Sequence, residues 1–525
     1  MKEEARGGAV KEVSNMELEN PKKYHGQVEK EVEEKDQIIE AIGHFGKWQL
    51  KYFIIVGLIT LPTAFPVLSI VFTAASTDFW CSIPQSLEGR VNSSAWINMS
   101  SPLKEDGSHD LCHVWDVQDP EEYLGGNAEL VNRTKSCQAW DYDRSLFQHT
   151  ILQHYDLVCD RDKWKNTSQA AYFLGMIIGV FAAGWLADSF GRKTVLIPIV
   201  ILASVFGSAT AFMPTIQGYI ALRFLTGLVN IGIFLVGFVW CIETVGGKWQ
   251  TIVGIGFEAP WVVAWFLTAL VAHLFPDWRH FQLVTSIPMI LCGLGYWFLP
   301  ESPKWLLANG KIDQAEDLVR EAVEMNGRTL PTGWRLQPLD QDDQGVGKSS
   351  NPTVFHLFTR PHLATKTLIL YFNWFANSFV YYGLTLNSED IGGSVMMNFL
   401  LGGFTEIPAY LFSLWILLKK GRKIPYAGMM LTGGIALFCT LAVPRDVYVK
   451  NWPVVVLVMI GKLCITGKKA SISLLSLNAL CTYLSQMYFF QVPLPLHMCT
   501  VPRSTPPWFG QQEWAPPLSW LVWVD

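Results

Sequence analysis

The sequence predicts an all-α membrane protein made of two bundles of membrane-spanning helices. Its 525 residues are 50% apolar and only 16% charged, and the mean hydropathy is +0.23. The apolar residues fall in runs of about 20, the length at which a helix crosses a bilayer core of about 30 Å. This pattern excludes a cytosolic enzyme, a disordered chain and a small disulfide-stabilised protein. The 40 Lys and Arg nearly balance the 45 Asp and Glu, so nucleic acid is not an expected partner.

The N-terminal part predicts a charged tail followed by a kinked helix. Residues 1–47 are rich in charge, contain no cleavable signal pattern, and are expected to be a cytosolic tail. Apolar residues within 38–45 have helical spacing and suggest a segment lying on the membrane surface. The first span is expected at about 53–74, where Pro62 and Pro66 kink a membrane helix without forbidding it.

A long polar loop, residues 76–168, separates the first predicted span from the second. It carries four Asn-x-Ser/Thr acceptors for glycosylation: Asn92, Asn98, Asn132 and Asn166. It also holds four candidate disulfide cysteines: Cys81, Cys112, Cys137 and Cys159. Together they predict an oxidising, non-cytosolic side. Four cysteines allow three pairings, and the sequence does not choose among them.

Nine further apolar runs complete the predicted membrane domain. They lie at about 170–187, 194–212, 219–240, 252–274, 281–299, 365–386, 395–418, 425–443 and 453–466. Residues 48–299 would form a six-helix half, 300–364 a cytosolic bridge, and 365–466 a partial second half. Lys and Arg concentrate in the loops opposite the glycosylated one, which predicts a cytosolic N-terminus. Two halves joined by a bridge are typical of secondary transporters.

A charged motif stands between the second and third predicted spans. It reads Gly184-Trp-Leu-Ala-Asp188-Ser-Phe-Gly191-Arg192-Lys193 and resembles the pattern G-x-L-a-D-x-x-G-R-(R/K) of the major facilitator superfamily. Its two glycines permit a tight turn and close helix approach. Asp188 is expected to pair with a cation on a neighbouring helix end and so hold an inner gate shut. A charge cluster that only fixes topology is the alternative.

Further blocks narrow the resemblance to one family. They are Ile42–Gln49, Arg223–Gly227, Glu243–Gln250, Trp278–Gln282, Pro300–Leu307, Asn373–Leu384 and the weak half-repeat Gly421-Arg422-Lys423. With the long glycosylated loop, they resemble the organic cation, carnitine and organic anion transporters over about residues 36–466. The gating residues added in this way are Arg223, Glu243, Glu301 and Arg422. Gln250 departs from the family, which usually has a basic residue there.

The resemblance implies a major facilitator fold of two six-helix halves in the plasma membrane. Its substrates would be small organic ions, cations or zwitterions such as carnitine-like compounds, moved by alternating access. It implies no enzyme, and with no phosphate loop or metal cluster in the sequence no cofactor or metal is expected. Coupling to a proton or to sodium stays open. An organic anion transporter and a sugar facilitator are weaker alternatives, since Pro-Glu-Ser-Pro at 300–303 also occurs in sugar carriers.

Aromatic faces together with one acid are the expected way to hold an organic cation. Trp374, Asn377 and Tyr381 share a helix face at i, i+3 and i+7, with Tyr382 beside them. The resemblance places Trp374, Tyr381 and Phe234 at positions like those of an aromatic cage. The alternative is that these aromatic residues serve packing or the membrane interface.

Glu406 is the single most informative residue, because it is an acid deep within a predicted span. An intramembrane charge costs about 3 kcal/mol or more, so a function is the first hypothesis. We expect Glu406 to meet the substrate cation or to carry a proton. A buried pair with Lys462 is the alternative. Glu258 is a weaker case and is expected to be a structural, hydrogen-bonding acid.

The resemblance ends after about residue 466. Residues 467–525 form an atypical tail, rich in Pro and Trp, where the family would complete the tenth span and add two more. A shifted frame, a retained intron or an alternative exon would explain such a tail. The sequence therefore predicts about ten spans with a truncated second half. A non-transporting product, or one that interferes with full-length copies, is the second functional hypothesis.

Overall fold

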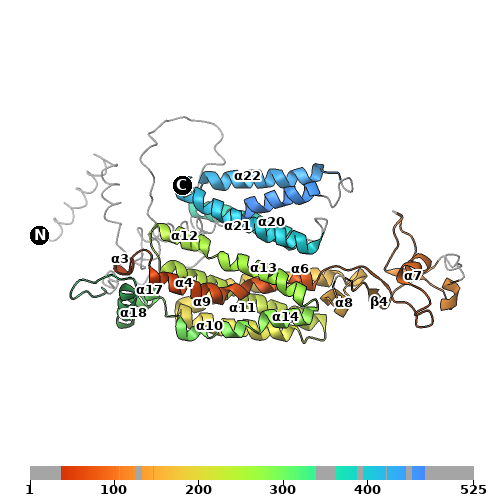
Figure 1. The fold of residues 1–525 in the computed structure, drawn as a ribbon, viewed down its shortest axis with the longest axis horizontal. Coiled ribbons are helices and arrows are strands. Elements are labelled where there is room, and N and C mark those ends of the chain that lie inside the picture. Colours follow the sequence, from red (N-terminus) through yellow and green to blue (C-terminus); the bar gives the residue numbers. More distant parts are fainter. Residues whose placement is uncertain are drawn as a thin grey trace.

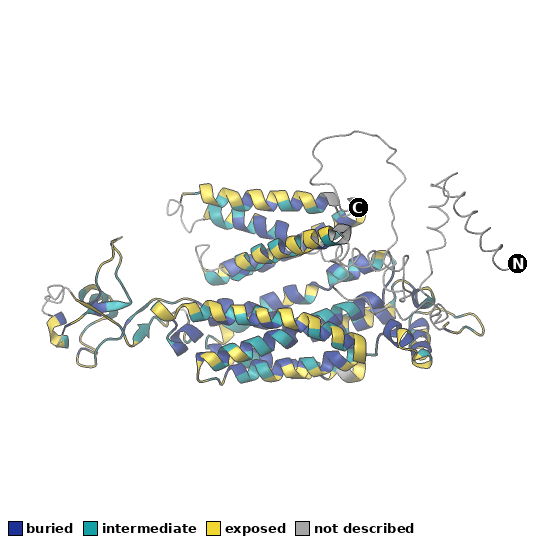
Figure 2. Cartoon of the chain, turned by 180° about the vertical axis from the view of Figure 1, so that it is seen from behind, coloured by how far each residue is buried: buried dark blue, intermediate teal, exposed yellow. Residues whose placement is uncertain are grey.

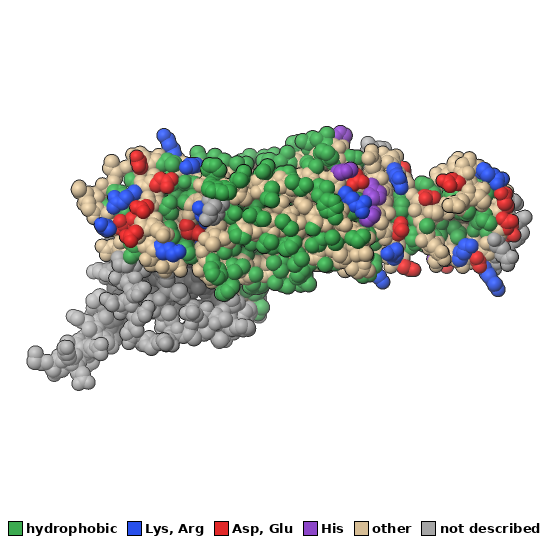
Figure 3. Space-filling view, turned by 90° about the horizontal axis from the view of Figure 1, so that it is seen from below, with side chains coloured by type: hydrophobic (Ala, Val, Ile, Leu, Met, Phe, Trp, Pro, Cys, Tyr) green, Lys and Arg blue, Asp and Glu red, His purple; other side chains and the backbone are tan. Residues whose placement is uncertain are grey.

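The computed structural model describes residues 37–105, 107–117, 119–124, 133–145, 147–337, 361–386, 394–420, 423–444 and 452–467. In this part of the chain, helices run side by side as an elongated bundle, and a small domain projects from one end (Figure 1). The face drawn in Figure 3 carries a broad hydrophobic belt, with charged side chains gathered toward its two ends. A bilayer core needs such a belt, and the predicted all-α membrane protein is confirmed.

The first half supplies most of the bundle. Its helices are α4 (Lys47–Thr60), η1 (Leu61–Ala64), α5 (Phe65–Leu68), α6 (Ile70–Thr73), α9 (Lys163–Phe190), α10 (Arg192–Thr210), α11 (Ile216–Glu243), α12 (Lys248–Gly256), α13 (Ala259–Leu274), α14 (Trp278–Ser286), α15 (Met289–Cys292) and α16 (Gly295–Phe298). The first span is interrupted at Pro62 and Pro66, as predicted, because proline removes a helical hydrogen bond at each position.

The second half is described as α20 (Pro361–Leu386), α21 (Val395–Lys420), α22 (Lys423–Cys439), η6 (Thr440–Ala442) and a shorter helix, Trp452–Gly467. Among the described residues, 7 helices are long and apolar enough to span a membrane. The other three predicted runs are also helical, as the interrupted series α14 to α16, as α20 and as Trp452–Gly467. Arg422 and the tail from residue 468 lie outside the described residues.

Burial follows the bundle geometry. In Figure 2 the outward helix faces are exposed and the inward faces are buried. Many exposed side chains are large and apolar, including Phe181, Trp297, Phe379 and Phe438. Water would disfavour such a surface, whereas lipid accepts it, so these residues mark faces that meet the bilayer.

The projecting part, residues 76–162, is here called the loop domain. Its elements are β1 (Phe79–Cys81), α7 (Ser93–Ser100), β2 (His113–Trp115), η2 (Pro120–Tyr123), β3 (Thr134–Ser136), β4 (Trp140–Tyr142), α8 (Ile151–Tyr155) and η4 (Cys159–Arg161). β1 pairs with β4, and β2 pairs with β3, both antiparallel. A small core of Leu87, Trp96, Val117 and Tyr123 supports them.

Disulfides join Cys81 to Cys137 and Cys112 to Cys159, which selects one of the three open pairings. Each disulfide joins segments that are far apart in the sequence. The strands of this domain are short and its core is small, so the disulfides contribute to holding these segments together. The acceptors Asn92, Asn98 and Asn166 are exposed, and Asn166 lies in the first turn of α9. Asn132 lies outside the described residues.

The bridge forms a helical layer at the opposite end of the bundle, with α17 (Pro303–Ala308) and α18 (Ile312–Met325). α3 (Gln37–Ile42) packs on α18, and its residues Ile38, Ile39 and Ile42 are buried in the same core as Val319. The expectation that this segment lies on the membrane surface is therefore wrong. Its apolar stripe is covered by protein.

Candidate functional site

Glu406 lies in the middle of α21 and is fully buried. Its Oε1 atom accepts hydrogen bonds from the Tyr381 hydroxyl at 3.0 Å and the Thr466 hydroxyl at 3.3 Å. Its Oε2 atom has no hydrogen-bond partner among the described residues. A buried acceptor of this kind costs free energy, so an incoming donor or cation would be stabilised there.

Tyr381 links this acid to the first half. Its hydroxyl accepts a hydrogen bond from the Trp261 indole N–H at 3.2 Å while donating to Glu406. Trp261 is on α13, Tyr381 on α20 and Glu406 on α21. The carboxylate is thus held at the boundary between the two halves, where helices from both meet.

Glu258 is a second buried acid at the same boundary. It stands where α12 gives way to α13, a break favoured by Pro260 two residues later. The hydroxyl of Tyr410, one turn beyond Glu406 on α21, donates to Glu258 Oε2 at 3.4 Å. Tyr410 also interacts electrostatically with Glu406. Glu258 therefore faces the predicted site, and it accepts a hydrogen bond there, as expected of a structural, hydrogen-bonding acid.

Lys462 is buried beside these acids, but its ammonium group lies over the Trp265 ring, 4.0 Å from the centroid. Glu406 acts on it electrostatically from nearby. Gly402 makes this placement possible, because a Cβ atom there would meet Nζ at 2.6 Å. The predicted alternative was a buried ion pair between Glu406 and Lys462. Lys462 is indeed a nearby positive charge, but the face of Trp265 holds its ammonium group.

The other predicted substrate residues have different surroundings. Asn377 is buried one turn before Tyr381, and its Oδ1 atom has no hydrogen-bond partner among the described residues. Trp374 is half-buried on the same face of α20. Tyr382 packs against Phe173 of α9 with ring centroids 5.1 Å apart. Phe234 of α11 packs edge-on against Phe257, at 5.2 Å.

The charged motif forms a tight cluster at the bridge end of the bundle. Buried Arg192 binds Glu243 at 2.7 Å, and Glu243 also accepts a hydrogen bond from Ser302 at 2.5 Å. The Glu301 carboxylate accepts the backbone N–H groups of Arg192 at 2.8 Å and Lys193 at 3.1 Å. Two helix N-terminal donors and one buried ion pair therefore fix the start of α10.

The predicted pairing of Asp188 with a cation on a neighbouring helix end is found, since Arg192 is the first residue of α10. Asp188 pairs with Arg192 of its own motif at 3.0 Å, and its side chain is 73% exposed. Every described residue of this cluster belongs to the first half or to the start of the bridge, so no inter-half gate contact is seen in this part of the chain. A side chain at Gly184 would meet nothing within 4 Å, so the predicted close approach occurs only at Gly191.

Arg223 is not brought into this cluster. It lies near the other end of α11, where it donates to the Pro66 carbonyl and to Gln169, both at 2.7 Å. Its guanidinium also stacks 4.7 Å from the Tyr172 ring centroid. Its contacts are those of a residue that holds α11 against the kinked first span and α9.

Comparison with known proteins places this architecture in a family. The model of the sugar (and other) transporter family matches residues 125–471. A Drosophila melanogaster organic cation transporter protein is 34% identical, over 84% of this chain and 80% of its own length. Solute carrier family 22 member 1 of Bos taurus is 30% identical, over 82% of this chain and 77% of its own. The chain belongs to the organic cation transporter (solute carrier 22) family.

A solved structure supports the fold of this transporter. The partially occluded, inward-open xylose transporter XylE from E. coli aligns with a TM-score of 0.51 and 14% identity. The alignment covers 82% of this chain and 87% of that one. The major facilitator fold is therefore shared, and the chain is a multi-pass membrane transporter rather than an enzyme.

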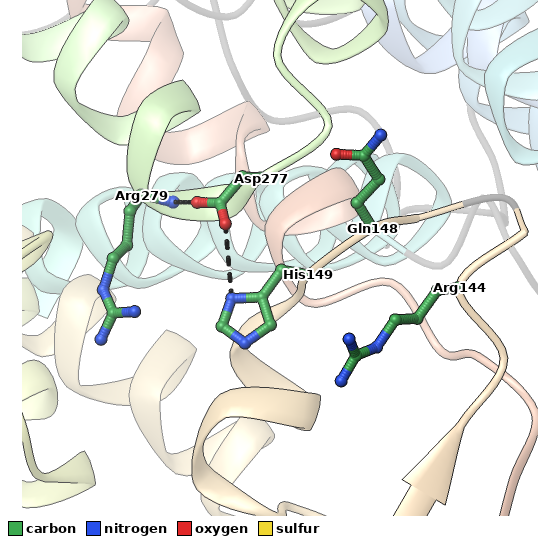
Figure 4. A pocket seen from close by; sticks show the side chains of 5 residues that line it. All are labelled: Arg144, Gln148, His149, Asp277 and Arg279. Carbon is green, nitrogen blue, oxygen red and sulfur yellow. Dashed lines mark hydrogen bonds and ion pairs between the residues drawn. The ribbon is translucent and has the colours of Figure 1, made fainter.

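The transporter also has a polar pocket where the loop domain meets the bundle (Figure 4). Its volume is about 540 Å³, and it is lined by Arg144, Gln148, His149, Asp277 and Arg279. Asp277 contacts His149 at 3.5 Å and accepts the backbone N–H of Arg279 at 2.8 Å, capping α14. The sequence offered no signal for this pocket, since its residues come from two distant segments.

Proposed function

We propose that this transporter moves small organic cations, or zwitterions of the carnitine type, across the plasma membrane by alternating access. The observation that carries the proposal is the Glu406 carboxylate, buried between the halves with one oxygen atom that accepts no hydrogen bond among the described residues. A substrate cation would supply the missing charge and contact. The organic cation transport named for the relatives supports the same substrate class.

Aromatic residues complete the proposed site. Tyr381 orients Glu406, Tyr382 packs against Phe173 of the first half, and Trp374 and Phe234 would add further rings. Cation–π contacts contribute about 0.5–2 kcal/mol each and tolerate varied substrate shapes. The Asn377 amide adds a polar group for a zwitterion or an ester. An organic anion or a sugar fits less well, because two buried carboxylates face this region.

The orientation follows from charge. We propose that the motif and bridge end is cytosolic, because Arg192, Lys193 and the basic residues of the bridge lie there. The N-terminus would then be cytosolic and the loop domain extracellular. The two disulfides and the exposed acceptors Asn92 and Asn98 suit that side.

Uptake of tetraethylammonium by cells expressing the chain tests the proposal. We expect saturable uptake that Glu406→Gln abolishes, because the amide keeps the shape and the hydrogen bonds but removes the charge. Surface biotinylation must show equal amounts of both proteins. Glu324→Gln, at an exposed position on α18, is the matched control and should transport normally. Uptake by Glu406→Gln at normal affinity would remove Glu406 as the cation partner.

A non-transporting product is the second candidate. The tail from residue 467 departs from the family pattern, and the match to the family model ends at residue 471. Polar surfaces of an incomplete half would meet lipid, which disfavours its folding. Absent uptake by a chain that reaches the cell surface would favour this candidate. Reduced uptake by a co-expressed relative would identify interference.

A further inference from the structure

The polar pocket between the loop domain and the bundle carries an excess of positive charge. Its lining includes two arginines, Arg144 and Arg279, and one acid, Asp277. Both carboxylate oxygens of Asp277 are engaged, because Oδ1 accepts the backbone N–H of Arg279 at 2.8 Å and Oδ2 lies 3.5 Å from His149 Nδ1. Two guanidinium cations therefore line the pocket against one carboxylate, which leaves one positive charge even when His149 is neutral.

Arg279 holds one of these cations in a fixed position. Its Nε atom donates to the Ala211 carbonyl at 3.1 Å, and its Nη2 atom donates to His154 Nε2 at 2.8 Å. The guanidinium also lies 5.1 Å from the centroid of the Trp278 ring. A guanidinium has five N–H donors, so three remain beyond these two bonds. A donor group that is already held in place loses little freedom when it binds an anion.

Arg144 supplies the second cation from the loop domain. It is exposed and lies in the segment that follows β4. Figure 4 shows the guanidinium groups of Arg144 and Arg279 to either side of the His149 ring. Burial lowers the pKa of His149, and the Arg279 and Arg144 cations lower it further, against Asp277. Both arginines therefore act on the same imidazole, which places them within reach of one small ligand.

The size of the pocket favours an organic ligand over a single inorganic ion. Its volume of about 540 Å³ lies within the range of about 300–1,000 Å³ that small-molecule sites occupy. Gln148 also lines it and adds an amide that can donate or accept a hydrogen bond. Oxyanions suit such a lining, because a guanidinium pairs with carboxylate or phosphate oxygens through two parallel hydrogen bonds.

We propose that this pocket binds a soluble organic acid, whose carboxylate or phosphate oxygens are shared between Arg144 of the loop domain and Arg279 of α14. Such a ligand would fasten the loop domain to the bundle, because its contacts come from both. It would bind apart from the proposed substrate site, since Glu406 lies in the middle of α21. The inference does not depend on which ion the carrier moves.

Binding of succinate tests the inference, with phenyl phosphate as the phosphate probe. The whole chain, purified in detergent, is titrated calorimetrically at neutral pH, and potassium chloride keeps the ionic strength constant. We expect saturable binding and a rise in melting temperature, because only the folded protein brings the two arginines together. Chymotrypsin should also cleave the junction of the loop domain more slowly when succinate is bound.

Arg144 is the position to vary, since Arg279 also holds the junction through Ala211 and His154. Arg144→Gln should weaken succinate binding about tenfold or more, because a charge-assisted pair is lost. Arg144→Lys keeps the charge without the planar fork, so its affinity should fall between the two. Arg133→Gln removes the same charge at an exposed loop-domain position outside the pocket lining, and it should bind succinate as the unmodified chain does.

Several results would overturn the inference, and the melting temperature shows that each variant is folded. They include equal binding by Arg144→Gln and the unmodified chain, and the absence of saturable binding of both probes. An equal loss in Arg144→Gln and Arg133→Gln would show that net charge alone explains the effect. Stabilisation by phosphatidylglycerol that Arg144→Gln removes, with neither soluble probe bound, would replace the soluble acid by a lipid headgroup. None of these results requires transport, so the proposed function is tested separately.

Discussion

At the scale of single residues, the charged motif contains two glycines with different surroundings. Gly191 has a φ of +107° and joins α9 to α10, and a Cβ atom there would collide with the Glu301 carboxylate. Gly184 lies within α9 and has open space around its Cβ position. We expect Gly191→Ala to destabilise the protein by about 1–3 kcal/mol, because that backbone region is costly for other residues.

The matched substitution is Gly184→Ala. It should leave the melting temperature unchanged or slightly raised, because alanine favours a helix interior. Thermal unfolding of both variants in detergent, followed by size-exclusion chromatography with fluorescence detection, makes the comparison. An equal fall in melting temperature in the two variants would show that the turn at Gly191 has no particular need for glycine.

Residue types predicted the chemistry of the site better than its pairings. Glu406 stood out in the sequence because an acid within an apolar run needs a reason, and the structure places it at the boundary between the halves. The Lys462 ammonium can lie over Trp265 because Gly402 leaves space for it. These three residues come from three different helices, and no local sequence pattern records such a meeting. The motif predicted that Asp188 meets a cation on a neighbouring helix end, and Arg192 at the start of α10 is that cation, although no pattern showed that the pair would lie within one half.

At the scale of elements, one asparagine fastens the bridge to the first span. Asn326 follows α18. Its Oδ1 atom accepts a hydrogen bond from the backbone N–H of Trp48 at 2.9 Å. Its Nδ2 atom donates to the Ile42 carbonyl at 2.9 Å and to Gln49 at 3.0 Å. These bonds satisfy backbone groups at the end of α3 and the start of α4.

We expect Asn326→Ala to destabilise the docking of α3 and α18 by about 1–3 kcal/mol, because it leaves these groups without partners. Limited proteolysis from the bridge side would show faster cleavage near residue 43. Asn309→Ala is the matched control, since Asn309 is exposed and its side chain donates, within the described part of the chain, to the Trp305 carbonyl four residues earlier. Unchanged cleavage of the Asn326 variant would contradict this role.

Helices could be predicted where their cause is local. The proline interruptions of the first span follow from the missing N–H groups of Pro62 and Pro66. The surface placement of α3 failed because an apolar stripe does not say whether lipid or protein covers it. The break between α12 and α13 has a local cause in Pro260, but the hydroxyl that meets Glu258 comes from Tyr410 on α21, which no local pattern records.

At the scale of the whole molecule, the loop domain docks on the bundle through α8. The Tyr155 hydroxyl donates to the Met213 carbonyl at 2.8 Å, and the Trp278 N–H donates to the His149 carbonyl at 3.1 Å. Arg279 donates to His154 Nε2 at 2.8 Å. Since a guanidinium only donates, His154 must be neutral with Nε2 as the acceptor. The contact therefore depends on the protonation of an imidazole.

Burial and the Arg279 cation lower the pKa of His154 from its ordinary value of 6.5, and burial also lowers the pKa of His149, against Asp277. A group whose pKa is lowered in the folded protein binds its proton more readily when unfolded. Stability from this contact is therefore complete above about pH 6.5 and declines as the pH falls from there through the folded pKa values. The loss of stability is modest because the His149 and His154 rings are both partly exposed.

We expect the melting temperature of the purified chain to fall between pH 7.5 and pH 5.5, with faster proteolysis at the junction of the loop domain. His154→Gln should flatten this dependence, because its side-chain oxygen can still accept from Arg279 but takes up no proton. His280→Gln, at a side chain that is 72% exposed, should keep the full dependence. If His154→Gln is as sensitive to acid as the unmodified chain, the junction is held by its other contacts, and the Arg279–His154 bond adds nothing to it.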